Sequence, residues 1–520
     1  MAPDTTRVTD VPALEGLPIR NIEITSRNIF DPLPTGALRP IGRMANKLHV
    51  RTRKQTVRDQ LILRPDERWT TDRGREAARQ LRMLGFLEPD HISARPVGDS
   101  VEVAVQTHDF WTTQPEFDVQ QASGGHFGSL AFSERNLLGL GKSLTLAYRE
   151  DPVGITRGIA LHDPGFAGTR LQLDYDASRG TSGATDFFGA AVPFYAEDTR
   201  LSFGGLGNRA TSQSHLFENN TEVAVVPQHL EETEWFFGRG RRDDGNILRW
   251  TTSFYTLDRR LGATQYSPSQ PPPAAFIGPE ESLSLRRLAI QARFWKPDYV
   301  ERIGIERIDR VEDYDLGPSL AVKGGYAPKA FGSTADEGYA QGQLDLGAQT
   351  RFGFGFLRSA LSTRLRRGPR EMLATLEARW IRQPSLSHSL VFGLTGTGGY
   401  NMPRTFQVTI GGLNGLRAYP VHAVAGTQVL RWNVEDRLTL VRDVLQMASL
   451  GSAIFYDGAN ARGPGSEGAG SFHDAGFGLR IAPPRSALGP VFRVDLAWPI
   501  HPTRDGRRQP VLSVGSSQAF

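Results

Sequence analysis

Short segments in which polar and apolar residues alternate recur from about residue 111 to the end of the chain, and no other feature limits the fold as strongly. Residues 143–148 and 171–176 alternate in this way, and residues 491–498 place Arg493 and Asp495 on one face and Val494 on the other. Successive side chains of a strand point to opposite faces, so a period of two predicts strands between polar and apolar surroundings. A soluble protein of several sheets and a membrane barrel both show this pattern, but charged residues inside the segments favour a barrel with a polar lumen.

Residues 111–520 are therefore expected to form an all-β transmembrane barrel of about 16 antiparallel strands. The sequence has no run of about 18 apolar residues, so no transmembrane helix is expected. Three stretches that are polar or rich in Pro or Gly are expected to be long outer loops, at residues 208–234, 261–285 and 458–474.

The region before the barrel has a different pattern and is expected to be a small α+β domain over residues 17–110, preceded by a tail of residues 1–16. Its expected elements are a strand at 19–24, helical turns at 39–49 and 56–63, a helix at 73–84 and a hairpin at 86–106.

Basic residues exceed acidic ones by 60 to 56 in the chain, and the excess lies mainly in this N-terminal region. Arg39, Arg43 and Lys47 recur every four residues and so share one face of the expected helix. This face is either simply solvated or a surface for anionic partners such as lipid headgroups. No basic stripe with interleaved aromatic residues is present, so nucleic acid is not an expected partner.

The sequence contains no convincing catalytic or metal-binding motif. Its lack of Cys excludes disulfides, Cys-ligated zinc and thiol catalysis. Residues 139–143 resemble the end of a P-loop, but Asn136 stands where that motif requires glycine. The 11 His residues show no metal-ligand spacing, and no G-x-S-x-G nucleophile elbow occurs. We therefore expect no enzyme, no cofactor and no metal site.

The most informative segment is residues 411–420, which contain too much glycine for the interior of a strand. Its candidate site residues are Gly411, Gly412, Leu416, Arg417, Ala418 and Tyr419. The segment resembles the lumen-loop signature of the BamA/TamA superfamily of outer-membrane assembly and secretion barrels, in which Val/Ile-Arg-Gly-Phe/Tyr folds back into the barrel. Residues 134–141, 455–458, 476–480 and 495–497 resemble strands of the same superfamily, and residues 17–110 resemble one POTRA domain, its periplasmic module.

The resemblance implies that Arg417 pairs with an acidic residue of the inner wall, with Asp457 as the first candidate and Asp495 as the second. A guanidinium group engages a carboxylate through two hydrogen bonds, which Lys cannot do. Ala418 stands where the superfamily has glycine, so the tip of the loop is expected to bend differently. An alternative interpretation is that Arg417 only maintains the shape of the loop and barrel.

The resemblance also implies a function, namely assembly of outer-membrane proteins. Client polypeptides would be received by the POTRA-like domain, at residues 19–24 or 86–106, and inserted at a weak seam between the first and last strands. The candidate seam residues are Phe117, Val119, Gly515 and Phe520. The alternatives are a two-partner-type polypeptide secretion channel and a passive outer-membrane pore.

The expected location is the outer membrane, with the N-terminal domain in the periplasm. The expected partners are the outer-membrane lipid bilayer, unfolded or partly folded client proteins, and a periplasmic chaperone or accessory protein. Residues 1–18 contain no visible signal peptide, so we expect this start to be processed or misassigned.

Overall fold

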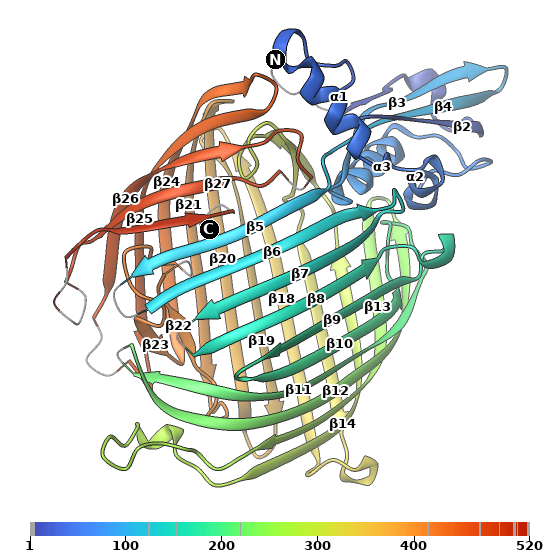
Figure 1. Ribbon diagram of the computed structural model, residues 1–520. Helices are drawn as coiled ribbons and strands as arrows, with labels where there is room; N and C mark the ends of the chain where they lie inside the picture. The colour runs from blue at the N-terminus through green and yellow to red at the C-terminus, as the bar shows by residue number, and fades with distance from the viewer. Residues whose placement is uncertain are drawn as a thin grey trace.

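The computed structural model divides into a large barrel and a small domain at one of its ends (Figure 1). It describes residues 6–122, 125–151, 153–218, 220–412, 415–466, 470–487, 489–502, 506 and 508–516. Phe520, one of the expected seam residues, lies outside the described residues.

The N-terminal domain packs three helices against a four-stranded sheet of order β1-β3-β4-β2. Its elements are β1 (Arg7–Val8), β2 (Ile19–Arg27), α1 (Arg39–Leu48), α2 (Lys54–Gln60), α3 (Thr71–Met83), β3 (Leu87–Val97) and β4 (Ser100–Asp109). The Thr70 hydroxyl accepts a hydrogen bond from the Arg73 amide at 3.1 Å and so caps α3, which begins two residues before the expected start at residue 73. The expected tail contributes an edge strand, because β1 pairs in parallel with β3.

The barrel is closed, and all of its neighbouring strands are antiparallel. Its wall consists of β5 (Thr113–Ala122), β6 (Gly125–Leu137), β7 (Lys142–Asp151), β8 (Gly154–Asp163), β9 (Gln172–Gly180), β10 (Gly183–Val192), β11 (Leu201–Glu218), β12 (Thr221–Asp243), β13 (Asn246–Leu261), β14 (Glu281–Trp295), β17 (Ser319–Ala327), β18 (Glu337–Thr350), β19 (Gly353–Leu365), β20 (Pro369–Ser385), β21 (His388–Tyr400), β24 (Gln428–Val444), β25 (Ala448–Arg462), β26 (Phe472–Ala482), β27 (Phe492–Pro499) and β28 (Val511–Gly515).

The barrel expectation is confirmed, but the strand count of about 16 is wrong, because the closed sheet has 20 strands. The error arose partly at residues 208–234, which were expected to be a loop and instead belong to β11 and β12. Polar residues on both faces are compatible with a strand here, because the part of a strand that extends beyond the lipid belt faces water on both sides. The other two expected loops are confirmed in part: residues 262–280 connect β13 and β14, and residues 463–466 and 470–471 lie between β25 and β26, whereas the outer residues of the expected ranges 261–285 and 458–474 belong to these strands.

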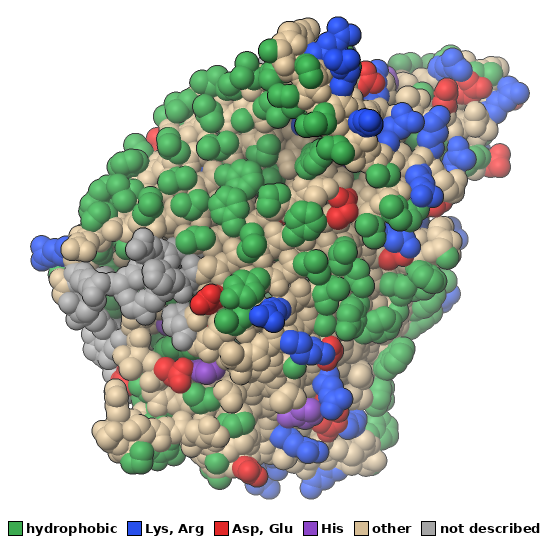
Figure 2. Space-filling model, in the orientation of Figure 1, with side chains coloured by type: hydrophobic (Ala, Val, Ile, Leu, Met, Phe, Trp, Pro, Cys, Tyr) green, Lys and Arg blue, Asp and Glu red, His purple; other side chains and the backbone are tan. Residues whose placement is uncertain are grey.

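Side chains alternate between an apolar outer face and a polar inner face of the wall. Lys323 Nζ on β17 contacts Glu234 Oε1 on β12 at 2.7 Å. Because β13 and β14 separate these strands, this contact crosses the concave inner side. The adjacent residues Trp235 and Phe237 point the other way and are 64% and 49% exposed. Hydrophobic side chains cover much of the outer wall on the side toward the N-terminal domain (Figure 2), as a lipid-facing belt requires.

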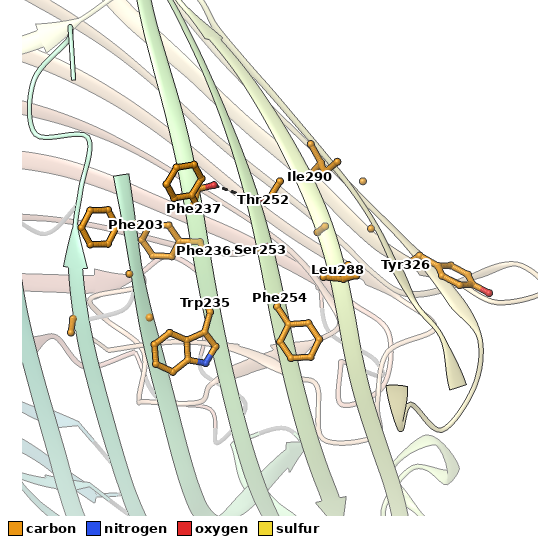
Figure 3. A pocket seen from close by; sticks show the side chains of 16 residues that line it. Phe203, Trp235, Phe236, Phe237, Thr252, Ser253, Phe254, Leu288, Ile290 and Tyr326 are labelled. Atoms are coloured by element: carbon orange, nitrogen blue, oxygen red, sulfur yellow. Dashed lines mark hydrogen bonds between the residues drawn. The ribbon is translucent and has the colours of Figure 1, made fainter. Parts of the chain in front are cut away.

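A shallow depression of about 920 Å³ lies on this outer face, across β10–β14 and β17 (Figure 3). Its lining includes Trp235, Phe254, Leu288 and Tyr326 and contains no charged side chain. Such a lining suits hydrocarbon chains and offers nothing to hold a polar substrate. None of the helices in the described part of the chain is long and apolar enough to cross a membrane.

Two additional hairpins lie apart from the wall sheet. β15 (Tyr299–Ile303) pairs with β16 (Val311–Asp315) between wall strands β14 and β17, on the side of the N-terminal domain. β22 (Val408–Ile410) pairs with β23 (Val424–Gly426) between β21 and β24, at the opposite end. Both hairpins lie near the lumen, and the contacts that they make there form the candidate site.

Candidate functional site

The loop between β22 and β23 is a compact turn whose glycines allow the backbone to fold tightly. Gly411 has φ 142° and Gly412 has φ 62°, and a Cβ on Gly411 would collide with the carbonyl of Pro420. The Gly412 amide donates to the Tyr419 carbonyl at 2.8 Å, which closes the turn. Leu416 is fully buried. This geometry directs Arg417 at the inner wall.

Arg417 is buried, with 1% of its surface exposed, and it contacts acidic side chains on two strands. Its Nε and Nη2 donate to the two carboxylate oxygens of Asp457 on β25, at 2.7 and 2.9 Å. Its Nη1 donates to Asp495 on β27 at 3.4 Å. The guanidinium group also lies 3.2 Å from the centre of the Phe455 ring. Arg417 therefore holds its loop to the wall through a bidentate ion pair and a cation–π contact.

The residues after Arg417 attach the loop to β26. The Ala418 amide donates to Asp474 Oδ2 at 3.0 Å, and the single hydrogen of the Tyr419 hydroxyl is shared between the carbonyls of His473 and His501, which lie 3.0 and 3.1 Å away. Ala418 does not have a positive φ, so the loop does not need the glycine that the superfamily has at this position. The expected difference in bend from the superfamily's loop remains a prediction.

Ion pairs continue from Asp495 along the inner wall toward the N-terminal domain. Arg480 donates to Asp495 at 2.5 Å and to Glu435 at 2.8 Å, and Arg493 donates to Asp495 at 2.9 Å. Arg437 lies 3.4 Å from Glu435. All of these side chains are at most 7% exposed. Taking such charges out of water is costly, and removing one partner typically costs about 3–5 kcal/mol because it leaves the other unpaired.

The β15–β16 hairpin joins this network at the end of the lumen nearest the N-terminal domain. Glu306, in the turn of the hairpin, contacts Arg437 at 3.3 Å and Arg379 at 2.7 Å. Arg437 also donates to the carbonyl of Ile305 at 3.0 Å. Ile305 and Leu316 pack with Phe354 and other apolar residues of the inner wall. The hairpin thus lies against the inside of the barrel.

The N-terminal domain holds the other side of the same hairpin. Arg82 on α3 donates to both carboxylate oxygens of Asp313, at 2.7 and 2.5 Å, and to Glu301 at 2.8 Å. Arg310 of the hairpin pairs with Glu88 on β3 at 2.9 Å. Contacts between charged groups therefore run from the N-terminal domain through the hairpin to the loop that carries Arg417.

Residues of the β21–β24 connection also reach across the far end of the lumen. Gln407 donates to the Phe217 carbonyl at 2.7 Å, and the Phe217 ring stacks on His422 with 4.0 Å between ring centres. Arg404 donates to the carbonyls of Gly262 and Pro279 at 2.7 and 2.6 Å. The connection therefore lies over the mouth of the barrel, from β25–β27 on one side to β11 and β13 on the other.

The barrel closes where β5 meets β28, the first and last strands of the wall. Four residue pairs form this seam among the described residues, including Val119 with Val514 and Gly515 with Asp118. The Phe117 amide adds a hydrogen bond to the Ser516 hydroxyl at 3.3 Å. A Cβ on Gly515 would meet the Asp118 carboxylate, so a larger residue at this position requires the Asp118 side chain to move. By contrast, the described residues of β11 and β12 pair along nearly the whole length of the two strands.

The structure brings together the expected residues Arg417, Asp457 and Asp495, and it places Phe117, Val119 and Gly515 at the closure. Sequence reasoning did not assign the roles of Arg437, Arg480 and Asp474, although these residues fall on inward positions of alternating strands. It also missed the β15–β16 hairpin entirely. The sequence signal that could have revealed this hairpin is the length of the segment 296–318, which exceeds that of a tight turn between two wall strands.

No protein-family model matches the chain, and no curated protein matches it. Among solved structures, CdiB from Escherichia coli has 10% identity and a TM-score of 0.46, covering 97% of this chain and 76% of its own. CdiB from Acinetobacter baumannii has 10% identity and a TM-score of 0.43, covering 96% and 74%. BamA from Haemophilus ducreyi lacking POTRA domains 1–3 has 13% identity and a TM-score of 0.40, covering 96% and 84%.

Proposed function

We propose that this protein is an outer-membrane assembly factor that inserts client polypeptides at the seam between β5 and β28. The observation that carries the proposal is the closure of four residue pairs among the described residues, the shortest ladder of the described wall; the adjacent β27–β28 ladder has five pairs and the other ladders have eight or more. Opening a short ladder breaks few hydrogen bonds and exposes backbone N–H and C=O groups, which can pair with a client strand. The Arg417 loop contacts β25, β26 and β27, so it braces the wall beside the seam.

The N-terminal domain supports the first step of this function, the capture of a client strand. β2 is an edge of its sheet, and its outward-alternating residues are exposed from Asn21 to Arg27. The expected alternative site, the hairpin at residues 86–106, is less suitable, because β4 lies between β3 and β2. We therefore assign strand addition to the free edge of β2.

A passive pore is a weaker proposal, since structural elements lie across both ends of the lumen. The β15–β16 hairpin packs against the inner wall at one end, and the β21–β24 connection crosses the other. A polypeptide secretion channel requires both elements to move aside. Secretion therefore ranks second, and the following experiment separates it from insertion.

A disulfide across the seam tests the proposal directly. The chain has no Cys, so the double variant Val119→Cys/Val514→Cys introduces one pair at register partners. Facing residues of an antiparallel ladder have Cα atoms about 4.5–5.5 Å apart, which a disulfide can bridge. The matched control is Val494→Cys/Val514→Cys, which uses the same residue on β28 but joins it to its other neighbour, β27.

Insertion of a client barrel into proteoliposomes is the measurement, before and after reduction. We expect the oxidised seam variant to lose insertion and the reduced form to regain it, while the oxidised control remains active. Full insertion by the oxidised seam variant would rule out lateral opening. Translocation of a polypeptide into the vesicles by that same oxidised variant would instead identify a secretion channel.

A further inference from the structure

Helix α1 of the N-terminal domain exposes an apolar stripe that the domain does not use. Ile41, Met44 and Leu48 are 41%, 58% and 64% exposed, and their spacing places them on one side of the helix. The only buried residue of α1 is Gly42, whereas α2 and α3 bury apolar residues such as Val57 and Leu81 in the core.

A basic stripe runs beside the apolar one. Arg39, Arg43 and Lys47 are all exposed, and none of them forms an ion pair with another described residue. Helix α1 contains no acidic residue. An apolar stripe bordered by positive charge is the pattern of a helix that lies in the interface of an anionic bilayer.

The attachment of α1 to the domain leaves both stripes free. Asn46 accepts a hydrogen bond from the Phe30 amide at 3.0 Å and donates one to the Phe30 carbonyl at 2.9 Å. A side chain at Gly42 would meet Pro34, so the backbone of α1 lies close to the segment that precedes it. Gly42 and Asn46 are one turn apart and define the inner side of the helix.

Helix α1 also lies near the end of the barrel wall, where a helix at the membrane surface is expected. The Arg485 guanidinium, in the β26–β27 turn, lies 5.0 Å from the Phe30 ring and contacts Asp443 at 3.1 Å. The adjacent β24–β25 turn exposes Leu445 and Met447 by 67% and 43%. In Figure 1 α1 occupies the side of the domain nearest the wall strands β24–β27. The helix therefore lies at the rim where the apolar belt of the barrel ends.

We propose that α1 is a membrane anchor, which binds the N-terminal domain to anionic phospholipid headgroups at the rim of the barrel and inserts Ile41, Met44 and Leu48 among the acyl chains. The anchor holds the domain beside the wall strands and limits its rotation about the junction with β5. It is independent of the seam and of any client.

A single fluorescent label tests the anchor in the full-length protein. Because the chain has no Cys, Met44→Cys can carry a polarity-sensitive probe, and Arg95→Cys, at an exposed position of β3, is the matched control. Each labelled protein is placed as a single copy in nanodiscs of phosphatidylcholine, with or without phosphatidylglycerol. Spin-labelled lipids in the same discs quench any probe that enters the bilayer.

We expect blue-shifted emission and lipid quenching at position 44 only, stronger with phosphatidylglycerol and weaker at high salt. Neutralising the basic stripe with Arg39→Gln/Arg43→Gln/Lys47→Gln is expected to lower the docking equilibrium about a hundredfold, since each basic residue near an anionic surface contributes about 1 kcal/mol. No quenching at position 44 overturns the proposal. Quenching that is equal in both lipids and unaffected by the triple variant overturns the anionic assignment. Shielding of the probe that grows with protein concentration, without lipid quenching, identifies a second copy as the occupant instead.

Discussion

Replacing Arg417 by Lys tests whether the geometry of the ion pair or only its charge holds the lumen loop. Lys keeps the positive charge but cannot donate to both oxygens of Asp457 in the fork that Arg417 forms at 2.7 and 2.9 Å. It also loses the planar contact with the Phe455 ring. One charge-assisted hydrogen bond contributes about 1.5–3 kcal/mol, and a desolvated cation–π contact brings the total loss to roughly 2–5 kcal/mol.

The variant is measured in two ways. The temperature at which the folded barrel loses its heat-modifiable gel mobility reports on stability, and client insertion into proteoliposomes reports on function. We expect both to fall, with Arg417→Ala lower still because Asp457 then lacks its cation. Arg462→Lys is the matched control, since Arg462 is exposed at the end of the same strand, β25, and is expected to tolerate the change.

A double-mutant cycle with Asp457→Asn separates direct coupling from general loosening. Residues in one buried ion pair are expected to show an interaction energy of about 0.5–3 kcal/mol, so the double variant should be more stable than the sum of the single losses predicts. Wild-type mobility and insertion in Arg417→Lys would refute the bidentate interpretation. Strict additivity in the cycle would show that Arg417 and Asp457 act separately.

Further predictions concern the hairpin and the seam. Arg82→Ala leaves Asp313 and Glu301 without their cation, so we expect openings in planar-bilayer recordings to become at least about tenfold more frequent, while the control Arg95→Ala, at an exposed site, leaves the current unchanged. Replacing residues 297–317 by a two-residue Asn-Gly turn should give a permanently conducting barrel. A silent bilayer would show that the hairpin does not block the lumen. Burial and the nearby Glu306 carboxylate raise the pKa of Glu312 from 4.5 to about 7, so docking of the hairpin is favoured at low pH and this contribution is lost between about pH 4.5 and pH 7. Conductance should increase from pH 5 to pH 7 and level off above pH 7, and Glu312→Gln should abolish that increase. Gly515→Val introduces a side chain against Asp118, and we expect a lower heat-modifiability temperature with the rest of the wall intact, whereas an unchanged transition would mean that the seam tolerates a side chain there.

The barrel could be predicted because alternation is local, periodic information, whereas Asp457 and Asp495 were expected as partners of Arg417 because residues 411–420 resemble the loop of a known superfamily. Alternation places Arg493 and Asp495 on one side of β27 and Val494 on the other, and the structure buries the first two at 2% and 0% exposure. The number of strands could not be read in the same way, because a polar segment such as 208–234 looks like a loop whether it connects strands or extends them beyond the lipid. Only the closure of the sheet, with its register, sets the count at 20.

The sequence by itself determined that the chain alternates into a two-faced sheet, that residues 411–420 form a tight turn, and that an arginine at its tip needs a carboxylate. Only the tertiary structure decided that residues 299–315 fold inward as a hairpin, that Arg82 of a distant helix holds them, and that α1 carries its apolar stripe to the rim of the barrel. The physical reason is that alternation depends on neighbours two residues apart, whereas these contacts join distant parts of the chain, such as Arg437 with Glu306, 131 positions apart, and Arg82 with Asp313, 231 positions apart. Such contacts exist only once the wall has curved and closed around them.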